Sequence, residues 1–115
     1  MSNNLRGAFS LPLPAGEVDV LLNLNALRLC TEAEGIELGE LLEKMAGDSV
    51  TVLPKLLYAA YKNKVFLTGG TPVYEFEQFA AQVGTLDIEA ILENVQAAME
   101  AGEQGKATAA KAAQA

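Results

Sequence analysis

Apolar and polar side chains alternate along the first part of the chain, which predicts two strands. Phe9, Leu11 and Leu13 form one alternating run before a turn at residues 14–17. The apolar members of the second run are Val18, Val20, Leu22 and Leu24. A period of two is typical of a half-buried strand, so we predict a β-hairpin. Because Pro12 and Pro14 cannot donate ladder hydrogen bonds, we expect the first strand at an edge.

After the hairpin the apolar period becomes helical. One face of the first predicted helix carries Ala26, Leu29, Cys30 and Ala33. Asn25 is one candidate N-cap and Asn23 is the competing one, since either side-chain oxygen can accept a hydrogen bond from the first turn. Gly35 can adopt the left-handed conformation that ends a helix, so we expect the helix to stop there.

Two further helices follow at short intervals. The second is expected over about 37–46, ending at Gly47, with Leu38, Leu41, Leu42 and Met45 facing inward. The third is expected to be capped by Asp48 or Ser49, with Val50, Leu53, Leu57, Ala60 and Tyr61 inward and Leu56 also on its apolar face. Pro54 is best tolerated in a first turn, so this helix is expected to begin near Thr51.

The segment KNKVFLTGGTP interrupts the pattern, and Gly69-Gly70 permits a sharp reversal. Thr71 and Pro72 then fit an N-cap and a first helical position. This fourth helix is expected to end at Gly84, with Val73, Phe76, Phe79, Ala80 and Val83 inward. The fifth is expected to start at Asp87 or Thr85 and end at Gly102, with Ile88, Ile91, Leu92, Val95 and Met99 inward.

These elements predict a mainly α (α+β) fold, an N-terminal β-hairpin followed by a compact bundle of about five helices. A chain of 115 residues has the size of one domain. We assign residues 1–7 to a flexible N-terminus, 8–102 to a single helical domain with the hairpin, and 103–115 to a tail. That tail has almost no bulky apolar residue with which to offset its ordering entropy, so we expect it to be disordered or loosely helical.

Composition and charge argue against several classes of protein function for this chain. The net charge of −7 argues against binding nucleic acid through its phosphates. The sequence has no run of about 18 apolar residues, so no membrane span is expected. The N-terminus also lacks the layout of a signal peptide. The single cysteine excludes an internal disulfide and fits a reducing compartment. Lys55, Lys62 and Lys64 are the closest basic residues; they form either a solvated helix face or a patch for an acidic partner.

The sequence offers little for catalysis. It has no histidine and one cysteine, so a tetrahedral zinc site is not expected. Five acidic residues surround two helix ends without calcium-loop spacing, and we interpret them as a solvated face: Glu32, Glu34, Glu37, Glu40 and Glu43. Cys30 lies on an apolar helix face, where a small buried hydrophobe is expected. LTGGTP lacks the GK[ST] ending of a phosphate loop, so it is interpreted as a turn. We expect no cofactor and no enzyme activity.

One short motif supports an alternative. GDSVTVL, at residues 47–53, resembles the Asp-Ser-Leu helix start of acyl carrier proteins, in which the serine bears phosphopantetheine. Small size, acidity and helical content fit that resemblance, whereas Val50 in place of leucine and the preceding hairpin depart from it. Asp-Ser is also an ordinary helix cap. A carrier protein modified at Ser49 and a helical protein-interaction domain of other purpose are therefore the alternatives.

A longer resemblance spans about residues 8–101. The chain resembles the tail assembly chaperones of long-tailed phages and prophages, in which an FxLxxNAL segment leads into a helix followed by TGI-x-L-x-EL. The matching residues are Leu22, Leu24, Asn25, Ala26, Leu27, Glu34, Gly35, Ile36, Leu38, Glu40 and Leu41. Glu34 departs from the family's frequent threonine. TPVYEFEQFAAQVG is similar to the second helical half of the family.

The resemblance implies a non-enzymatic role. Such chaperones hold the tail tube protein or the tape measure protein in the host cell cytoplasm, and they are absent from the mature virion. Many are made in two lengths by a ribosomal frameshift. Binding a tail protein in this way needs an exposed apolar surface. The same surface could also join copies of this chain into a homo-oligomer. Our candidates for partner binding are Leu56, Tyr58, Phe66, Leu67 and Tyr74, with Leu21, Leu27 and Val65 as further surplus apolar residues.

Overall fold

The computed structural model describes residues 7–100 and begins with the predicted hairpin. β1 (Ala8–Leu13) pairs antiparallel with β2 (Gly16–Leu21), with Phe9 opposite Val20 and Leu11 opposite Val18. The turn is shorter than expected, and the second strand also ends earlier. Leu24 was predicted to continue the strand alternation, but it begins the first helix and is 67% exposed, because the side chain of Asn23 caps that helix first.

α1 (Leu24–Glu34) settles the choice between two caps. Asn23 is the N-cap, and its side-chain oxygen accepts hydrogen bonds from the backbone N–H groups of Asn25 and Ala26. The helix ends at Gly35, whose φ of 70° is left-handed. The helix therefore begins after an asparagine and ends at a glycine, the residue types that favour these two cap positions.

α2 (Leu38–Gly47) lies at the periphery, and its predicted apolar face is only partly covered. Leu41 is its one buried residue, whereas Leu38 and Leu42 are exposed. The prediction that they face inward was therefore wrong. The helical period correctly identified a helix but did not set how wide a stripe its neighbours cover.

α3 (Ser49–Leu67) is the longest element and begins at Ser49 rather than near Thr51. The Asp48 side chain caps it by accepting from the N–H of Thr51 at 3.4 Å. Val50 was expected inward but is 72% exposed, since it lies at the open end of the helix. Pro54 lies inside the second turn, where its missing N–H leaves one carbonyl near the exposed end for water.

α4 (Phe76–Val83) starts later than predicted. Glu75 is its N-cap and forms a capping box with Gln78, so Thr71 and Pro72 precede the helix in an extended loop. Val73, predicted inward, is 81% exposed on this loop. The reciprocal bonds of the capping box satisfy two free donors, which favours this start over the Thr-Pro pair.

The last helix covers residues 88–100 of the described chain. Asp87 accepts a side-chain hydrogen bond from the backbone N–H of Glu89, as one of the two predicted caps would. Ile91 and Val95 are buried in the core, while Ile88 is 38% exposed. Three predictions lie outside the described residues: the end of this helix at Gly102, the flexible N-terminus apart from Gly7, and the tail at 103–115.

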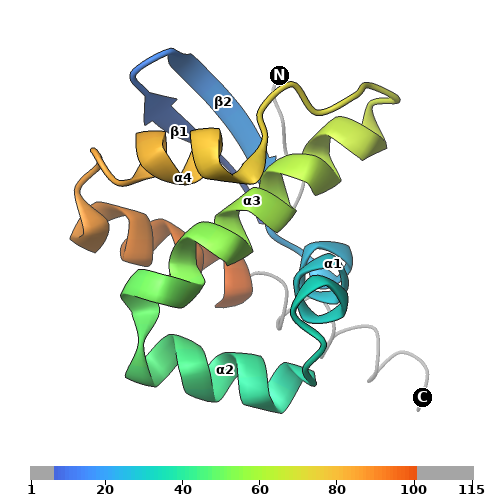
Figure 1. Cartoon of the computed structure of the whole chain (residues 1–115), viewed down its shortest axis with the longest axis vertical. Helices are drawn as coiled ribbons and strands as arrows, with labels where there is room; N and C mark the ends of the chain where they lie inside the picture. The colour runs from blue at the N-terminus through green and yellow to red at the C-terminus, as the bar shows by residue number, and fades with distance from the viewer. Residues whose placement is uncertain (1–6, 101–115) are drawn as a thin grey trace.

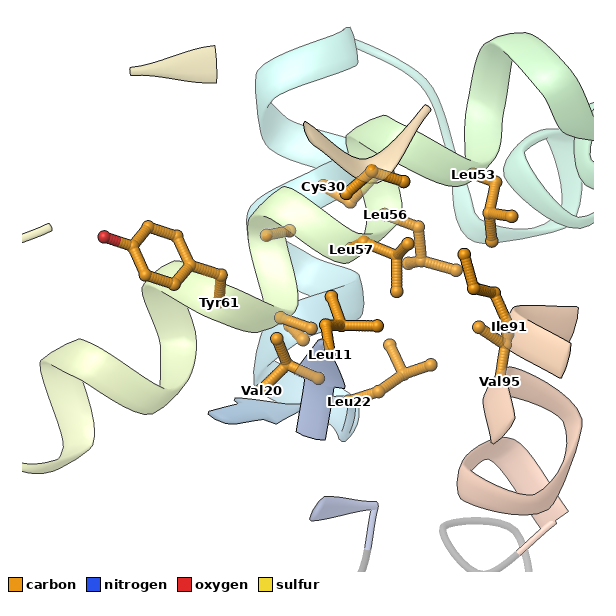
Figure 2. Packing of buried hydrophobic residues seen from close by; sticks show 14 of the residues in the cluster. Leu11, Val20, Leu22, Cys30, Leu53, Leu56, Leu57, Tyr61, Ile91 and Val95 are labelled. Atoms are coloured by element: carbon orange, nitrogen blue, oxygen red, sulfur yellow. The ribbon is translucent and has the colours of Figure 1, made fainter. Parts of the chain in front are cut away.

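α3 runs through the middle of the molecule and packs against β2, α1, α2 and α4 (Figure 1). In the same view α4 lies in front of the hairpin and α2 at the opposite end of the molecule. The core joins the hairpin to α3 and the last helix, as Leu11, Leu57 and Ile91 illustrate in Figure 2. The expected fold, a hairpin followed by five helices, is confirmed.

Candidate functional site

The described part of the chain is hollowed between α1 and α3. The two helices run in opposite directions, since Asn25 near the start of α1 contacts Asn63 late in α3, whereas Glu34 at the end of α1 contacts Lys55. A cavity of about 190 Å³ opens between them, and we call it the α1–α3 groove. Its lining is largely apolar and consists of Leu29, Cys30, Ala33, Glu34, Lys55, Tyr58, Ala59, Lys62 and Phe76.

An ion pair crosses one end of the groove. Lys55 Nζ lies 2.8 Å from a carboxylate oxygen of Glu34, and both side chains are about one-third exposed. The hydrogen bond to Glu34 raises the pKa of the Lys55 ammonium. A pair this accessible to water contributes at most about 1 kcal/mol. It therefore shapes the end of the groove more than it stabilises the fold.

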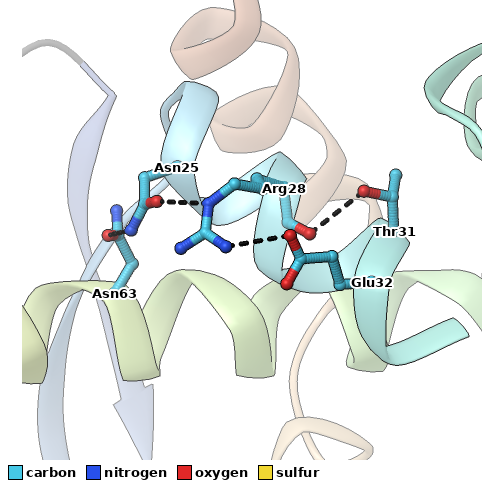
Figure 3. A network of polar contacts seen from close by, with 5 residues as sticks. All are labelled: Asn25, Arg28, Thr31, Glu32 and Asn63. Carbon is cyan, nitrogen blue, oxygen red and sulfur yellow. Dashed lines mark hydrogen bonds and ion pairs between the residues drawn. The ribbon is translucent and has the colours of Figure 1, made fainter.

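Outside the groove lining, a network of polar side chains joins the start of α1 to α3 (Figure 3). Asn63 is the only buried polar side chain among the described residues, at 4% exposed. Its Nδ2 donates to the carbonyl of Leu21 and to Asn23 Oδ1, and its Oδ1 accepts from Asn25 Nδ2 at 2.7 Å. The Asn25 amide oxygen in turn accepts from Arg28. Asn63 thereby ties the end of β2, the cap of α1 and α3 together.

Aromatic rings form the outer wall of the groove. Tyr58 lies edge-on to Phe76 with ring centroids 5.5 Å apart, and it also contacts Phe79. Its hydroxyl donates to the carbonyl of Tyr74 at 2.8 Å, which ties the wall to the loop before α4. Lys62 Nζ lies 5.0 Å from the centre of the Tyr58 ring, within cation–π range. A cation is thus held at the rim, over an apolar wall.

Cys30 contributes to the floor of the groove. Burial, and secondarily the charge of Glu34, raise the pKa of its thiol from 9.0 to about 11. A thiol with that pKa is protonated at neutral pH, and only the thiolate is a strong nucleophile. The expected buried, hydrophobe-like cysteine is confirmed.

The predicted partner-binding residues fall into three settings. Leu56 is 2% exposed, so placing it on a binding surface was wrong; it faces the core because it lies on the inward side of α3. Tyr58 and Tyr74 are half-buried. Phe66 and Leu67, at the end of α3, are 50% and 58% exposed and are available for contact. Of the further surplus residues, Leu21 is buried, while Leu27 and Val65 are half-buried.

Sequence reasoning missed the groove itself, although α3 carried a signal for it. Lys55, Ala59, Lys62 and Phe66 are spaced by four, three and four residues, which places them in one row along the helix. Proximity in the sequence groups Lys55, Lys62 and Lys64, but it does not show which of the three share a surface. The structure separates them, because Lys55 and Lys62 line the groove and Lys64 does not.

The Asp48–Ser49 pair has a local structural role in the fold, as the Asp48 cap begins α3. Ser49 is the first residue of that helix and is half-buried. Within residues 7–100, no cluster of His, Cys, Asp and Glu side chains could hold a metal ion. None of the helices in this range combines the length and apolar character needed to cross a membrane.

Comparisons with protein-family models, curated proteins and solved structures find no match to the chain.

Proposed function

We propose that this chain is a phage or prophage tail assembly chaperone, a non-enzymatic protein that binds the tail tube protein, the tape measure protein or both in the host cytoplasm while the tail is built. The observation that carries the proposal is the ordered residue set through NLNAL and EGIELGELLE, described above as a resemblance. Order and spacing across both motifs are more specific than any one residue, because each residue also has an ordinary structural use.

The surface of the described chain supports a binding role. Phe66 and Leu67 expose apolar area at the end of α3, and Leu24 does so at the start of α1. Contiguous exposed apolar area is typical of protein–protein contact sites, and Phe66 and Leu67 are neighbours in the chain. A protein that holds an aggregation-prone partner needs such a surface before the partner assembles.

The chemistry of the groove also supports binding rather than catalysis. The thiol on its floor is held protonated by burial. The lysine at one end is already paired with Glu34, and the tyrosine of the wall donates its hydroxyl to a backbone carbonyl. These groups are therefore engaged in holding the groove's shape.

The test is a pull-down of the tagged full chain from cells that express its whole native gene cluster, followed by mass spectrometry of everything recovered. We expect a tail tube or tape measure protein, and a frameshifted longer form of this chain would add support. Recovery of no tail protein would contradict the proposal. A mass increase localised to Ser49 would instead favour the carrier-protein alternative.

A further inference from the structure

The dimensions of the groove indicate what can occupy it. At about 190 Å³ it is smaller than the roughly 300–1,000 Å³ typical of small-molecule sites, so one bulky apolar side chain fills it. Single anchoring side chains in such pockets are how partner polypeptides commonly gain affinity. An anchor presented by another protein therefore fits this cavity better than a free ligand of ordinary size.

A second apolar contact lies on the same face of α3. Phe66 follows Ala59 by seven residues, which is two turns and about 10 Å along the helix axis. Phe66 is half exposed, whereas Ala59 forms part of the groove floor. A partner helix aligned with α3 would reach both with apolar side chains seven positions apart on one of its faces.

A positive charge lies between these two contacts. Lys62 is three residues after Ala59 and four before Phe66, and its ammonium pairs with no carboxylate among the described residues. The Tyr58 ring beneath it holds the ammonium at the rim. Although the chain has a net charge of −7, this single ammonium provides a local attraction for one acidic group on a partner.

We propose that the α1–α3 groove and Phe66 together bind an acidic amphipathic helix of a partner protein. The helix carries two bulky apolar residues seven positions apart, one filling the groove and one packing on Phe66, with an Asp or Glu between them that pairs with Lys62. The inference deepens the proposed function by specifying the segment of a tail protein that is recognised.

The test selects from a displayed library of 18-residue helical peptides against the immobilised full chain. We expect enriched peptides to share two apolar residues at a spacing of seven, with a carboxylate between them. Affinities of synthetic copies are then measured by fluorescence anisotropy for the full chain and four variants. Lys62→Glu and Phe66→Gln alter the site, while Lys64→Glu and Val50→Gln make the same changes on α3 away from the groove.

The expected result is a loss of about tenfold or more in affinity for Lys62→Glu and Phe66→Gln, and less than about twofold for the two controls. Exchanging the peptide's acidic residue for lysine should restore binding to Lys62→Glu. Equal losses in site and control variants would overturn the proposal, as would a failure to enrich this pattern. Binding of a fatty acid in the groove, detected by native mass spectrometry without any enriched peptide, would also overturn it.

The outcomes separate this inference from the proposed function. If the wild-type chain recovers a tail protein and the site variants recover it equally well, the groove assignment fails while the chaperone function stands. If no tail protein is recovered but the library yields the predicted pattern with the predicted variant effects, the groove binds an acidic helix of some other partner and the chaperone function fails.

Discussion

The buried amide of Asn63 provides the sharpest test of how this fold is held together. Replacing it by alanine removes three hydrogen bonds of 2.7–2.9 Å that join β2, the α1 cap and α3. The three partners are not affected equally. Asn23 Oδ1 still accepts from two backbone N–H groups, and Asn25 is exposed enough for its amide to turn to water. The carbonyl of Leu21, a residue 3% exposed, is the group that loses most.

The expected loss in the free energy of unfolding follows from these unequal effects on the three partners. Neutral hydrogen bonds contribute about 0.5–1.5 kcal/mol each, and a buried group left unpaired costs about 1–3 kcal/mol. One strongly affected carbonyl and two partly compensated groups give a loss of about 2–4 kcal/mol in the free energy of unfolding. Alanine also raises helix propensity, by up to about 0.7 kcal/mol, which works in the opposite direction.

The assay is urea denaturation followed by circular dichroism, with Asn94→Ala as the matched control. Asn94 is an exposed asparagine inside the last helix, so it reports the propensity gain alone. Asn63→Leu tests whether the side-chain volume lost in alanine affects stability. Asn63→Asp keeps the acceptor but places a carboxylate oxygen against the Leu21 carbonyl oxygen and Asn23 Oδ1. We expect all three Asn63 variants to be destabilised, with Asn63→Asp the least stable at pH 7 and partly recovered at acidic pH.

A contrary result would be informative. If Asn63→Ala lost less than about 1 kcal/mol relative to Asn94→Ala, the three hydrogen bonds would not be the structural tie described here. If Asn63→Leu were as stable as wild type while Asn63→Ala was not, packing volume rather than hydrogen bonding would explain the position.

Three further predictions concern single positions. Gly7→Ala should cost more than about 3 kcal/mol in urea denaturation, because φ is +84° and an added Cβ would lie 2.0 Å from the carbonyl oxygen of Leu22; wild-type stability would contradict the close approach. Gly35→Ala should cost only about 1–2 kcal/mol, since its φ of +70° is strained for alanine but nothing lies within 4 Å of the added Cβ. The Cys30 thiol, with its pKa raised to about 11, binds its proton more tightly in the folded state, so stability should fall between about pH 9 and 11 by up to about 2 kcal/mol more in the wild type than in Cys30→Ala. Parallel pH profiles of these two proteins would refute that assignment.

The elements of the fold were predictable where local chemistry specified them. The alternation through Leu11 and Leu13 correctly predicted the hairpin, and Gly35 correctly predicted the end of α1. Both signals depend only on residues close together in the sequence. The start of α4 was missed because two local signals competed. Thr71-Pro72 matched a helix start, but the capping box between Glu75 and Gln78 satisfied more donors.

Burial was less predictable than helix formation. Leu38 and Leu42 share the helical spacing of core residues yet remain exposed, since which face is covered depends on distant elements. The groove was missed for the same reason. Its walls come from α1, α3 and α4, and no single stretch of sequence contains the pairing of Glu34 with Lys55 or of Lys62 with the Tyr58 ring.

The length of α3 explains why apolar side chains remain uncovered at its end. Its 19 residues span about 28 Å, whereas the 11 residues of α1 span about 16 Å. Because Asn63 meets Asn25 at the start of α1, the turn of α3 that follows has no α1 residue opposite it (Figure 1). Phe66 and Leu67 lie on that turn and are half exposed or more, so they add little to the stability of the isolated chain. Folding alone would be served as well by polar residues there, and the partner helix proposed above would give these exposed apolar side chains a use by covering them.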